Sequence, residues 1–486
     1  MFNQYLPNIS FFIVALYIID FLLAFTIIFL ERKNPSATVA WIMIIFIVPV
    51  GGIFLYFMIS QNISKKRIFQ LHRFEETRIN EALHEQIKEM ASGDYQFLKP
   101  NVQNWQHLIK LHQSYSNSYY TQDNAIKILT DGKEKMASLL KDIREAKRSV
   151  NIMYFIVKND ETGRSLIEAL CEKARQGVKI RFLLDTMGSR QIYHRHLKDL
   201  KDAGGEYAFF FHPKFKVLNL KLNYRNHRKL VIIDNAIGYL GGFNIGNEYV
   251  QTTPKFGYWR DTHLRLTGSC VQDMQSRFVL DWRVASKEKL SLPKAYFDDP
   301  CSMGSTGIQI VSCGPDSTRE EIKHGYLKMI SAAEKNIFIQ TPYFVPDLSI
   351  LESLKNAAFS GVDVRIMIPC MPDHFFVYWA TFSYVGILLD AGVKIYIYDN
   401  GFMHAKTICT DGEVASVGSA NFDIRSFRLN FEVNAFVYDS SVVRDLEASF
   451  ESDMLSCHEL TREIYGKRRL YIKFKESISR LLSDLL

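Results

Sequence analysis

The chain has 486 residues, enough for two or three domains around sizeable buried cores. Apolar residues make up 47% of it and charged residues 23%, which excludes an intrinsically disordered protein. The formal net charge of +7, from 59 Lys and Arg against 52 Asp and Glu, is too small to indicate a nucleic-acid-binding protein.

Two long apolar segments near the N-terminus predict a transmembrane hairpin over residues 1–60. Ile9–Leu30 carries one charge, Asp20, and Thr38–Ile59 carries none. About 20 apolar residues suffice for a helix to cross the hydrocarbon layer. A cleaved signal peptide fits less well, because no Lys or Arg precedes the first segment and a second segment follows. The remaining alternatives are a buried soluble hairpin and, because of Pro49, a re-entrant second segment.

The basic residues that flank these segments predict their orientation. The loop between them holds Arg32 and Lys33, whereas the stretch after the second segment holds four basic residues, Lys65, Lys66, Arg67 and Arg73. The cytoplasmic side of a membrane protein carries the excess of Lys and Arg. We therefore expect a multi-pass protein of the cell membrane whose large C-terminal part is cytoplasmic.

A polar connector of predicted helix, residues 61–104, precedes an internal duplication. In each half a strand-like run leads into a helical pattern and then into a second strand-like run. These segments are 151–157, 165–176 and 177–185 in the first half, and 336–345, 349–360 and 361–369 in the second. Strands that alternate with helices indicate βαβ units and a mostly parallel sheet in each half. We expect an α/β fold of two similar domains packed as a pseudo-dimer, over residues 105–295 and 305–486.

A matched motif occurs at the corresponding point of each repeat. Each copy has His-x-Lys, an Asp seven residues after the His, and a Gly-x-x-Asn whose Asn comes 17 residues after the His. The matched residues are His227, Lys229, Asp234, Gly241 and Asn244 in the first copy, and His404, Lys406, Asp411, Gly418 and Asn421 in the second. A single His-x-Lys is a weak signal, but two copies with five matched positions are not a coincidence.

These residue types favour phosphoryl transfer. Residues i and i+2 of a strand share a face, so each His and Lys point into the same space. The Gly-rich turn lets a ligand approach the backbone and brings the Asn amide close. If the halves pack face to face, two His, two Lys and two Asn surround a group that is negative in its transition state. One imidazole attacks phosphorus and the other protonates the leaving oxygen. The lysines supply the positive charge, so we expect neither a metal nor a cofactor.

The segments HRKLVIID and HAKTICTD resemble the twin HKD motifs of the phospholipase D superfamily. The apolar hairpin, NPSATVAWI (34–42), TPYFVPD (341–347) and ESISRLLSDLL (476–486) further resemble bacterial cardiolipin synthases. This resemblance covers nearly the whole chain. It implies a phosphatidyltransferase that condenses two phosphatidylglycerols into cardiolipin and glycerol through a phosphatidyl-histidine. Its partners would be phosphatidylglycerol and anionic membrane lipid.

The resemblance also implies residue roles. The His, Lys and Asp of both motifs form the predicted catalytic set, although the motif Asp usually supports structure in the superfamily. Asn244 and Asn421 would hold the substrate phosphate. The superfamily favours His227 as the nucleophile, which the sequence itself leaves open.

A second acidic residue, downstream of each motif, is expected to orient each histidine. These residues are Glu432, which comes 28 residues after His404, and Asp261, which comes 34 residues after His227. The unequal spacing makes the assignment of Asp261 the weaker analogy.

The first half has an additional segment before its motif, which lies within residues 209–226. It contains four basic residues and no acidic one: Lys214, Lys216, Lys221 and Arg225. Our hypothesis is that it contacts anionic lipid headgroups beside the active site, and an ordinary solvated strand pair is the alternative. Residues 374–386 fit either a core helix, which we favour, or an interfacial one. The segment 476–486 has apolar residues at helical spacing, for docking on the protein or on the membrane.

Three classes of function remain open. The first is a membrane phosphatidyltransferase of the cardiolipin synthase type. The second keeps the site but changes the acceptor, as in a hydrolytic phospholipase D or a phosphatidylserine synthase. A nuclease is disfavoured by the hairpin and the modest charge, so we expect no nucleic-acid partner. A non-enzymatic lipid-binding membrane protein is disfavoured because both motifs are intact. The acceptor alcohol and the oligomeric state are not determined by the sequence.

Overall fold

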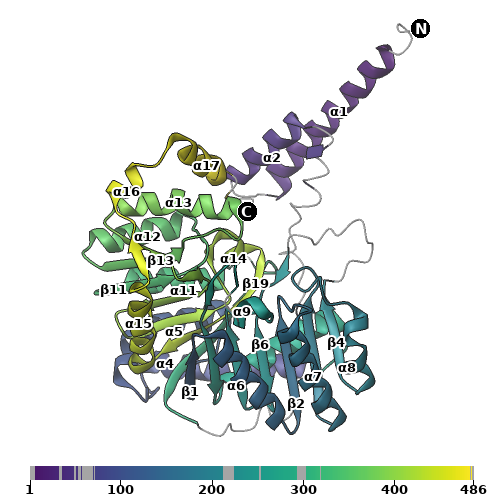
Figure 1. Cartoon of the computed structure of the whole chain (residues 1–486), viewed down its shortest axis with the longest axis vertical. Coiled ribbons are helices and arrows are strands. Elements are labelled where there is room, and N and C mark those ends of the chain that lie inside the picture. The colour runs from purple at the N-terminus through teal and green to yellow at the C-terminus, as the bar shows by residue number, and fades with distance from the viewer. Residues whose placement is uncertain are drawn as a thin grey trace.

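The fold is described here from a computed structural model. It covers residues 6–31, 35–48, 51–52, 56, 69, 72–211, 224–250, 253–292, 303–317, 319–481 and 483. The predicted lipid-contacting residues Lys214, Lys216 and Lys221 lie outside this range. Figure 1 shows two N-terminal helices that project from a larger body of strands and helices.

The projecting helices are α1 (Leu6–Thr26), which continues as a π-helix over Ile27–Glu31, and α2 (Pro35–Ile47). No helix in the described ranges is both long and apolar enough to cross a membrane, so the predicted two-span hairpin is not confirmed. The 13 residues of α2 rise about 20 Å, against about 30 Å of hydrocarbon.

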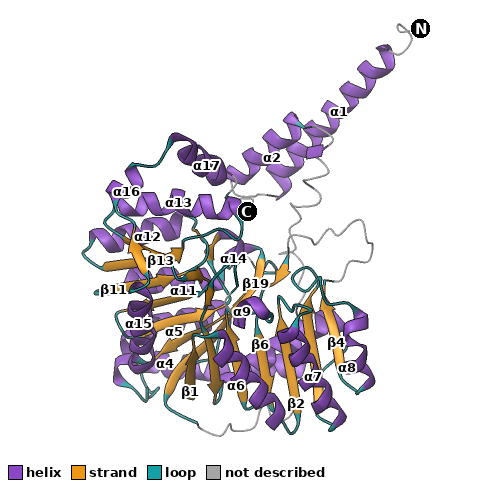
Figure 2. Ribbon diagram, in the orientation of Figure 1, coloured by secondary structure: helices purple, strands orange, loops and turns teal. Residues whose placement is uncertain are grey.

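The two halves share one continuous 16-stranded sheet (Figure 2). β1 (Thr121–Leu129) and β10 (Thr306–Cys313) pair antiparallel at its centre, and equivalent strands follow in the same order on either side. Outward from β1 these are β9 (His263–Thr267), β7 (Ile237–Gly241), β6 (Leu230–Ile233), β2 (Ser149–Tyr154), β3 (Lys179–Asp185) and β4 (Glu206–Phe210). Outward from β10 they are β19 (Asn430–Tyr438), β17 (Val414–Gly418), β16 (Thr407–Thr410), β11 (Asn336–Gln340), β13 (Asp363–Pro369), β14 (Lys394–Tyr398) and the additional β20 (Cys457–Glu459).

The prediction of two similar α/β halves is confirmed, but the prediction of a mostly parallel sheet is wrong. Only β2–β3–β4 and β11–β13–β14 run parallel, and the other strand pairs of this sheet are antiparallel apart from the short β5 (Arg225–Asn226). The predicted βαβ units account only for these parallel strands, whereas a tight turn joins each motif strand to the next as an antiparallel pair, β6 to β7 and β16 to β17. The halves also join edge to edge through β1 and β10, not face to face.

Helices cover the sheet in both halves. The first half carries α6 (Gly132–Glu145), α7 (Glu161–Arg175), a 3₁₀ turn (His194–Leu197), α8 (Lys198–Asp202), α9 (Asn247–Val250) and α10 (Cys270–Ser286). The second carries α11 (Glu321–Ala332), α12 (Leu348–Phe359), α13 (Phe375–Leu389), α14 (Ile424–Arg428), α15 (Ser440–Met454), α16 (Arg462–Gly466) and α17 (Leu470–Leu481). The connector contributes α4 (Arg73–Ser92) and most of a 3₁₀ helix (Pro100–Trp105). α5 (Gln106–Ser116) falls in the predicted first domain, yet Trp105 and Leu108 belong to the core of the second half.

The repeat is visible in how the helices begin. The side chain of Asp160 accepts the Gly163 amide at 3.0 Å at the start of α7, and Asp347 accepts the Ile350 amide at 3.2 Å at the start of α12. An aspartate in this position satisfies an amide that the helix itself leaves unpaired. An aspartate in the equivalent position thus begins the helix that connects two parallel strands in each half.

Candidate active site

One short strand from each half pairs with a strand of the other half, and a motif histidine directly follows each of these two strands. β5 pairs in parallel with β19 of the second half, and β15 (Gly401–Met403) pairs in parallel with β8 (Tyr258–Arg260) of the first. His227 directly follows β5, and His404 directly follows β15. The exchange therefore brings both histidines to the junction of the two halves.

Backbone contacts across the junction fix both positions. The His227 amide donates to the Phe431 carbonyl at 3.0 Å, and the His404 amide donates to the Arg260 carbonyl at 2.7 Å. The exposed fractions of the two residues are only 9% and 7%, so each ring has a restricted orientation.

Each histidine is oriented by a carboxylate from the opposite half. His227 Nδ1 lies 2.9 Å from both oxygens of Glu432, and His404 Nδ1 lies 2.6 Å from Asp261 Oδ2. Both predicted acidic residues are at the site, but their pairing with the histidine of their own motif is wrong. With Nδ1–H donated to the carboxylate, Nε2 of each ring keeps its lone pair.

Burial and charge act against each other in these pairs. Burial by itself would raise the pKa of Glu432, but the charges of His227 and Lys229 outweigh it and lower that pKa. The pKa of Asp261 is likewise lowered, because Lys406 and His404 outweigh its burial. Both carboxylates are therefore ionised at neutral pH.

The histidines differ in their surroundings. Burial lowers the pKa of His404 to about 4, and the Lys406 ammonium adds to this effect from 2.9 Å away at Nδ1. Burial also lowers the pKa of His227, while its contact with both Glu432 oxygens acts in the opposite direction.

The motif lysines lie behind the histidines. Lys229 Nζ donates to the His227 carbonyl oxygen at 2.6 Å, and Lys406 Nζ donates to the carbonyl oxygen of His404. Burial lowers their pKa values to about 7 and about 8, respectively. The His and Lys of each motif lie close together, as predicted. Each lysine, however, contacts the backbone carbonyl of its own histidine and does not line the cavity.

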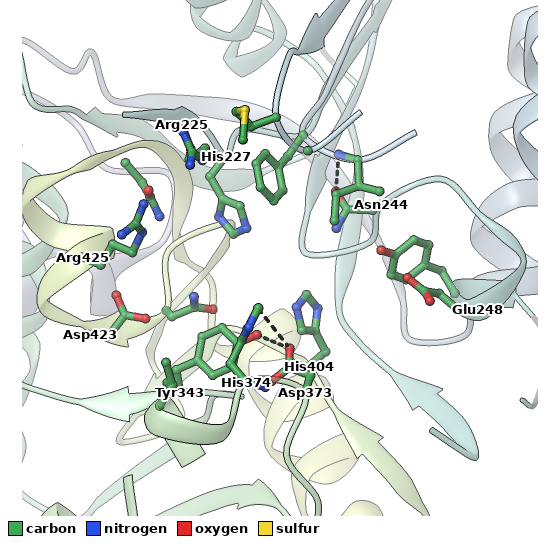
Figure 3. Close-up of a pocket in the computed structure, with 18 of the residues that line it drawn as sticks. Arg225, His227, Asn244, Glu248, Tyr343, Asp373, His374, His404, Asp423 and Arg425 are labelled. Atoms are coloured by element: carbon green, nitrogen blue, oxygen red, sulfur yellow. Dashed lines mark hydrogen bonds and ion pairs between the residues drawn. The ribbon is translucent and has the colours of Figure 1, made fainter. Parts of the chain in front are cut away.

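A cavity of about 800 Å³ opens at the junction, and both histidines and both asparagines line it. Figure 3 shows His227 and His404 facing this space from opposite sides, with Asn244 at its edge. Asn244 Oδ1 accepts the Ile156 amide at 3.2 Å, so this contact does not use its NH₂ group. The carbonyl oxygen of Asn421 is buried without a partner among the described residues. The four side chains can thus surround one small anionic group.

Asp234 and Asp411, predicted as part of the catalytic set, lie at the opposite ends of the motif strands. Their carboxylates accept three successive backbone amides each, from Lys147, Arg148 and Ser149 and from Glu334, Lys335 and Asn336. These amides precede β2 and β11. The two aspartates therefore fix strand ends and do not face the cavity.

The turns after the motif strands bring Asn244 and Asn421 to the cavity as predicted, but the groups that approach the motif glycines belong to the protein and not to a ligand. A Cβ on Gly241 would lie 2.5 Å from His263 Cα, and one on Gly418 would lie 2.2 Å from Asn434 Oδ1. Next to Gly241, a Cβ on Gly242 would lie 2.0 Å from Asp261 Oδ1. Protein groups occupy the space beside these glycines, and Gly242 lets Asp261 come close to the junction.

Sequence reasoning missed several residues of the site. Arg228 is fully buried, binds both Asp281 oxygens at 2.8 and 3.0 Å, and donates to the Glu432 carbonyl at 3.1 Å, so it holds β19 in place. The Tyr343 hydroxyl donates to Asp373 in the cavity wall. No sequence signal distinguished Arg228, which lies between the motif residues His227 and Lys229. Within the described ranges, no group of three or more His, Cys, Asp or Glu side chains has the arrangement of a metal site.

Comparisons with known proteins show that the chain is similar to cardiolipin synthases. The family model described as "Cardiolipin synthase, PLD-like domain" matches residues 139–254 and 326–454, and that described as "Phospholipase_D-nuclease N-terminal" matches residues 18–61. The chain is 48% identical over 471 residues to the major cardiolipin synthase of Bacillus subtilis, covering 97% of this chain and 98% of that protein. It is 47% identical over 479 residues to a cardiolipin synthase of Listeria monocytogenes, covering 98% and 99%.

A solved structure supports the fold alone. The phosphatidylserine synthase of Haemophilus influenzae aligns with a TM-score of 0.59 at 13% identity, over 78% of this chain and all of that one.

Proposed function

Because the chain belongs to the cardiolipin synthase family, we propose that it transfers a phosphatidyl group from one phosphatidylglycerol to another, giving cardiolipin and glycerol. The observation that carries this proposal is the histidine pair. Two imidazoles from the two halves face one cavity, and a buried carboxylate of the opposite half orients each of them.

The chemistry follows from that pair. Nε2 of one histidine bonds to phosphorus as the bond from phosphorus to the glycerol oxygen breaks, and the second histidine gives that oxygen its proton. Glycerol then leaves a phosphatidyl-histidine behind. The terminal hydroxyl of a second phosphatidylglycerol gives its proton to the second histidine and bonds to phosphorus as the N–P bond breaks. Cardiolipin forms, and both rings return to their starting state.

The groups around the pair stabilise the negative charge that develops on phosphorus. The amide groups of Asn244 and Asn421 lie at the cavity, and the ammonium groups of Lys229 and Lys406 lie just beneath it. Fixed donors in a site that excludes water stabilise such charge more than they would in solution. These residues can carry the reaction without any further group.

The experiment uses purified protein with labelled phosphatidylglycerol in mixed micelles and analyses the lipid products. We expect labelled cardiolipin together with glycerol in equal amounts. Phosphatidic acid as the sole labelled product would instead show a hydrolase, and no turnover at all would contradict an enzyme.

We further propose that the N-terminal helices hold the enzyme at the cell membrane. Large apolar side chains of α1 and α2 point outward, among them Phe21 (66% exposed) and Met43 (58% exposed). Apolar surface of this extent is unfavourable in water and suits lipid. The basic residues that follow residue 60 favour the cytoplasmic side for the catalytic halves.

The C-terminal helix extends this membrane-facing surface. α17 packs against α13, yet Leu470 and Phe474 remain 83% and 66% exposed. Lys475 of α17 lies over the Phe375 ring, which lines the cavity. In Figure 1, α13, α17 and α2 gather towards the same end of the long axis. This arrangement would place the mouth of the cavity where lipid headgroups can enter it.

A further inference from the structure

Two arginines line the cavity beside His227. Arg225 lies in β5, two residues before the histidine, and Arg425 lies in α14 of the second half. Figure 3 shows both on the side of His227 that is away from His404. Neither was part of the predicted catalytic set, although Arg225 belongs to the basic segment expected to meet lipid headgroups.

The two cations share a partly buried wall, which is unfavourable for both. Burial lowers the pKa of both arginines, while Asp185 acts in the opposite direction on Arg225, as Asp423 and Glu432 do on Arg425, and the charge of Arg425 lowers the pKa of Arg225 further. Like charges in a medium of reduced dielectric constant repel each other strongly. An anion bound between them would remove this repulsion.

The nearby carboxylates, Asp185 and Asp423, attract the two arginines and also accept backbone amides. Asp185 accepts the amides of Met187, Gly188 and Asn226 at 2.9 Å each. Asp423 accepts the Ser426 amide at 2.6 Å and starts α14. These aspartates shape the wall and moderate its charge, while the five N–H donors of an arginine fork are suited to a phosphate.

We propose that Arg225 and Arg425 bind the phosphate of the acceptor phosphatidylglycerol. This inference rests on the proposed function and specifies where the second substrate binds. The reacting phosphate lies between the two histidines, and the acceptor carries its own phosphate at the far end of its glycerol unit. An anion site beyond His227 therefore suits a phosphatidylglycerol acceptor and offers nothing to water or free glycerol.

This placement assigns the histidine roles. The acceptor hydroxyl enters beside His227, so His227 exchanges protons with the leaving and incoming oxygens, and His404 bonds to phosphorus. In-line displacement requires the nucleophile and the exchanging oxygen to lie on opposite sides of phosphorus. The contacts of the two rings differ in the same sense, because Lys406 Nζ lies 2.9 Å from His404 Nδ1, whereas His227 Nδ1 contacts both Glu432 oxygens, although burial lowers the pKa of both rings. The superfamily precedent for His227 as the nucleophile is thereby reversed.

The test compares two reactions of the full-length protein in mixed micelles. One is cardiolipin formation, which needs the acceptor phosphate. The other is exchange of labelled glycerol into phosphatidylglycerol, which uses the same histidines and donor phosphate but an acceptor without phosphate. In Arg225→Gln and Arg425→Gln we expect the ratio of the first rate to the second to fall about 10-fold to 100-fold, the loss of one charged hydrogen bond.

Two further variants sharpen the comparison. Arg425→Lys keeps the charge but loses the paired donors, so its ratio should lie between those of the unmodified protein and Arg425→Gln. Arg444→Gln, on the exposed face of α15, is the matched control and should leave the ratio unchanged. Glycerol exchange itself reports that each variant is folded.

The outcomes separate this inference from the function on which it rests. An equal loss of both reactions, or no loss of either, in the Gln variants would overturn the acceptor-phosphate site while leaving the cardiolipin synthase activity in place. Absence of both reactions in the unmodified protein would overturn the proposed function and the acceptor site together.

Discussion

At the residue scale, the two motif histidines are chemically unequal although their motifs match. His404 has an ammonium 2.9 Å from Nδ1 and a single close carboxylate oxygen, whereas His227 faces two carboxylate oxygens at 2.9 Å. A displacement at phosphorus needs one neutral ring and one protonated ring at the same time. Burial lowers the pKa of both rings, and it is the contact with both Glu432 oxygens that acts in the opposite direction at His227.

A substrate with a good leaving group separates the two roles. Phosphatidyl-p-nitrophenol needs no proton for its leaving group, so His227→Ala should still release about one equivalent of p-nitrophenolate in a rapid burst. His404→Ala should release none, because it lacks the nucleophile. Both variants should be inactive in cardiolipin formation. Stopped-flow absorbance measures the burst, and a burst from His404→Ala alone would reverse the assignment.

The lysines predict a pH dependence. The pKa of Lys229 is lowered to about 7 and that of Lys406 to about 8, so both ammonium groups are lost as the pH rises through this range. The positive charge beneath the phosphate is thus present below pH 7 and absent well above pH 8. We expect kcat/KM, which reports the free enzyme, to fall with an apparent pKa between about 7 and 8. Initial rates that stay constant up to pH 9.5 would contradict this.

The motif residues could be predicted from sequence, but their partners could not. His227 and His404 were identifiable because two five-residue patterns matched at equal spacing. The pairing of His227 with Glu432 joins residues 205 apart in the chain, and no local pattern encodes it. Arg228 and Arg425 were missed for the same reason, since their roles depend on contacts between the halves.

At the element scale, the turn after each motif strand explains the motif aspartates. Asp234 and Asp411 adopt φ values of 55° and 57°, a left-handed conformation that aspartate tolerates better than most residues. From there each carboxylate collects three backbone amides and holds the start of a neighbouring strand. The motif Asp is therefore matched in both halves because it anchors the strand that supports the histidine.

Substitution of Asp234 tests this anchoring role. Asp234→Ala should lower the free energy of unfolding by roughly 1–3 kcal/mol, because three amides lose their acceptor. Activity per folded molecule should stay close to that of the unmodified protein. Thermal unfolding and rates at low temperature measure the two quantities, with Asp445→Asn on exposed α15 as the control. Unchanged stability with lost activity would return Asp234 to the catalytic set.

α17 provides a second test at this scale. Phe474→Glu places a charge on its exposed apolar face and should weaken binding of the full-length protein to anionic vesicles, as well as its activity on phosphatidylglycerol in bilayers. Activity on detergent-dispersed substrate should remain. Vesicle flotation and paired assays measure this, and Glu451→Gln on α15 is the control. Equal activity of Phe474→Glu and the unmodified protein on bilayers would show that α17 does not contact the membrane.

The elements themselves were more predictable than their arrangement. The helices predicted over 165–176 and 349–360 lie close to α7 and α12, because apolar spacing is a local signal. The direction of the buried strands was not, since a strand covered on both faces has the same apolar character whichever way it runs. The exchanged strands β5 and β15 are too short to be recognised by any periodicity.

At the scale of the whole molecule, the active site exists only because the two halves are one unit. The sheet runs through β1 and β10 without interruption, and β5 and β15 each lie against the opposite half. Each of the two motif histidines thus has its backbone hydrogen bond and its carboxylate partner in the other half. Duplication supplied two equivalent lobes, and the exchange of strands turned them into a single site with two different rings.

The central claim is that both histidines act on one phosphodiester through a covalent intermediate. The direct measurement mixes the full-length protein with phosphatidylglycerol labelled in its acyl chains, quenches the reaction within the first turnover, and locates the label by mass spectrometry of peptides. We predict a phosphatidyl group on His404, formed together with one equivalent of glycerol and converted to cardiolipin when unlabelled phosphatidylglycerol is added. Release of glycerol with label on neither His404 nor His227, or an adduct that unlabelled phosphatidylglycerol does not convert, would contradict the account.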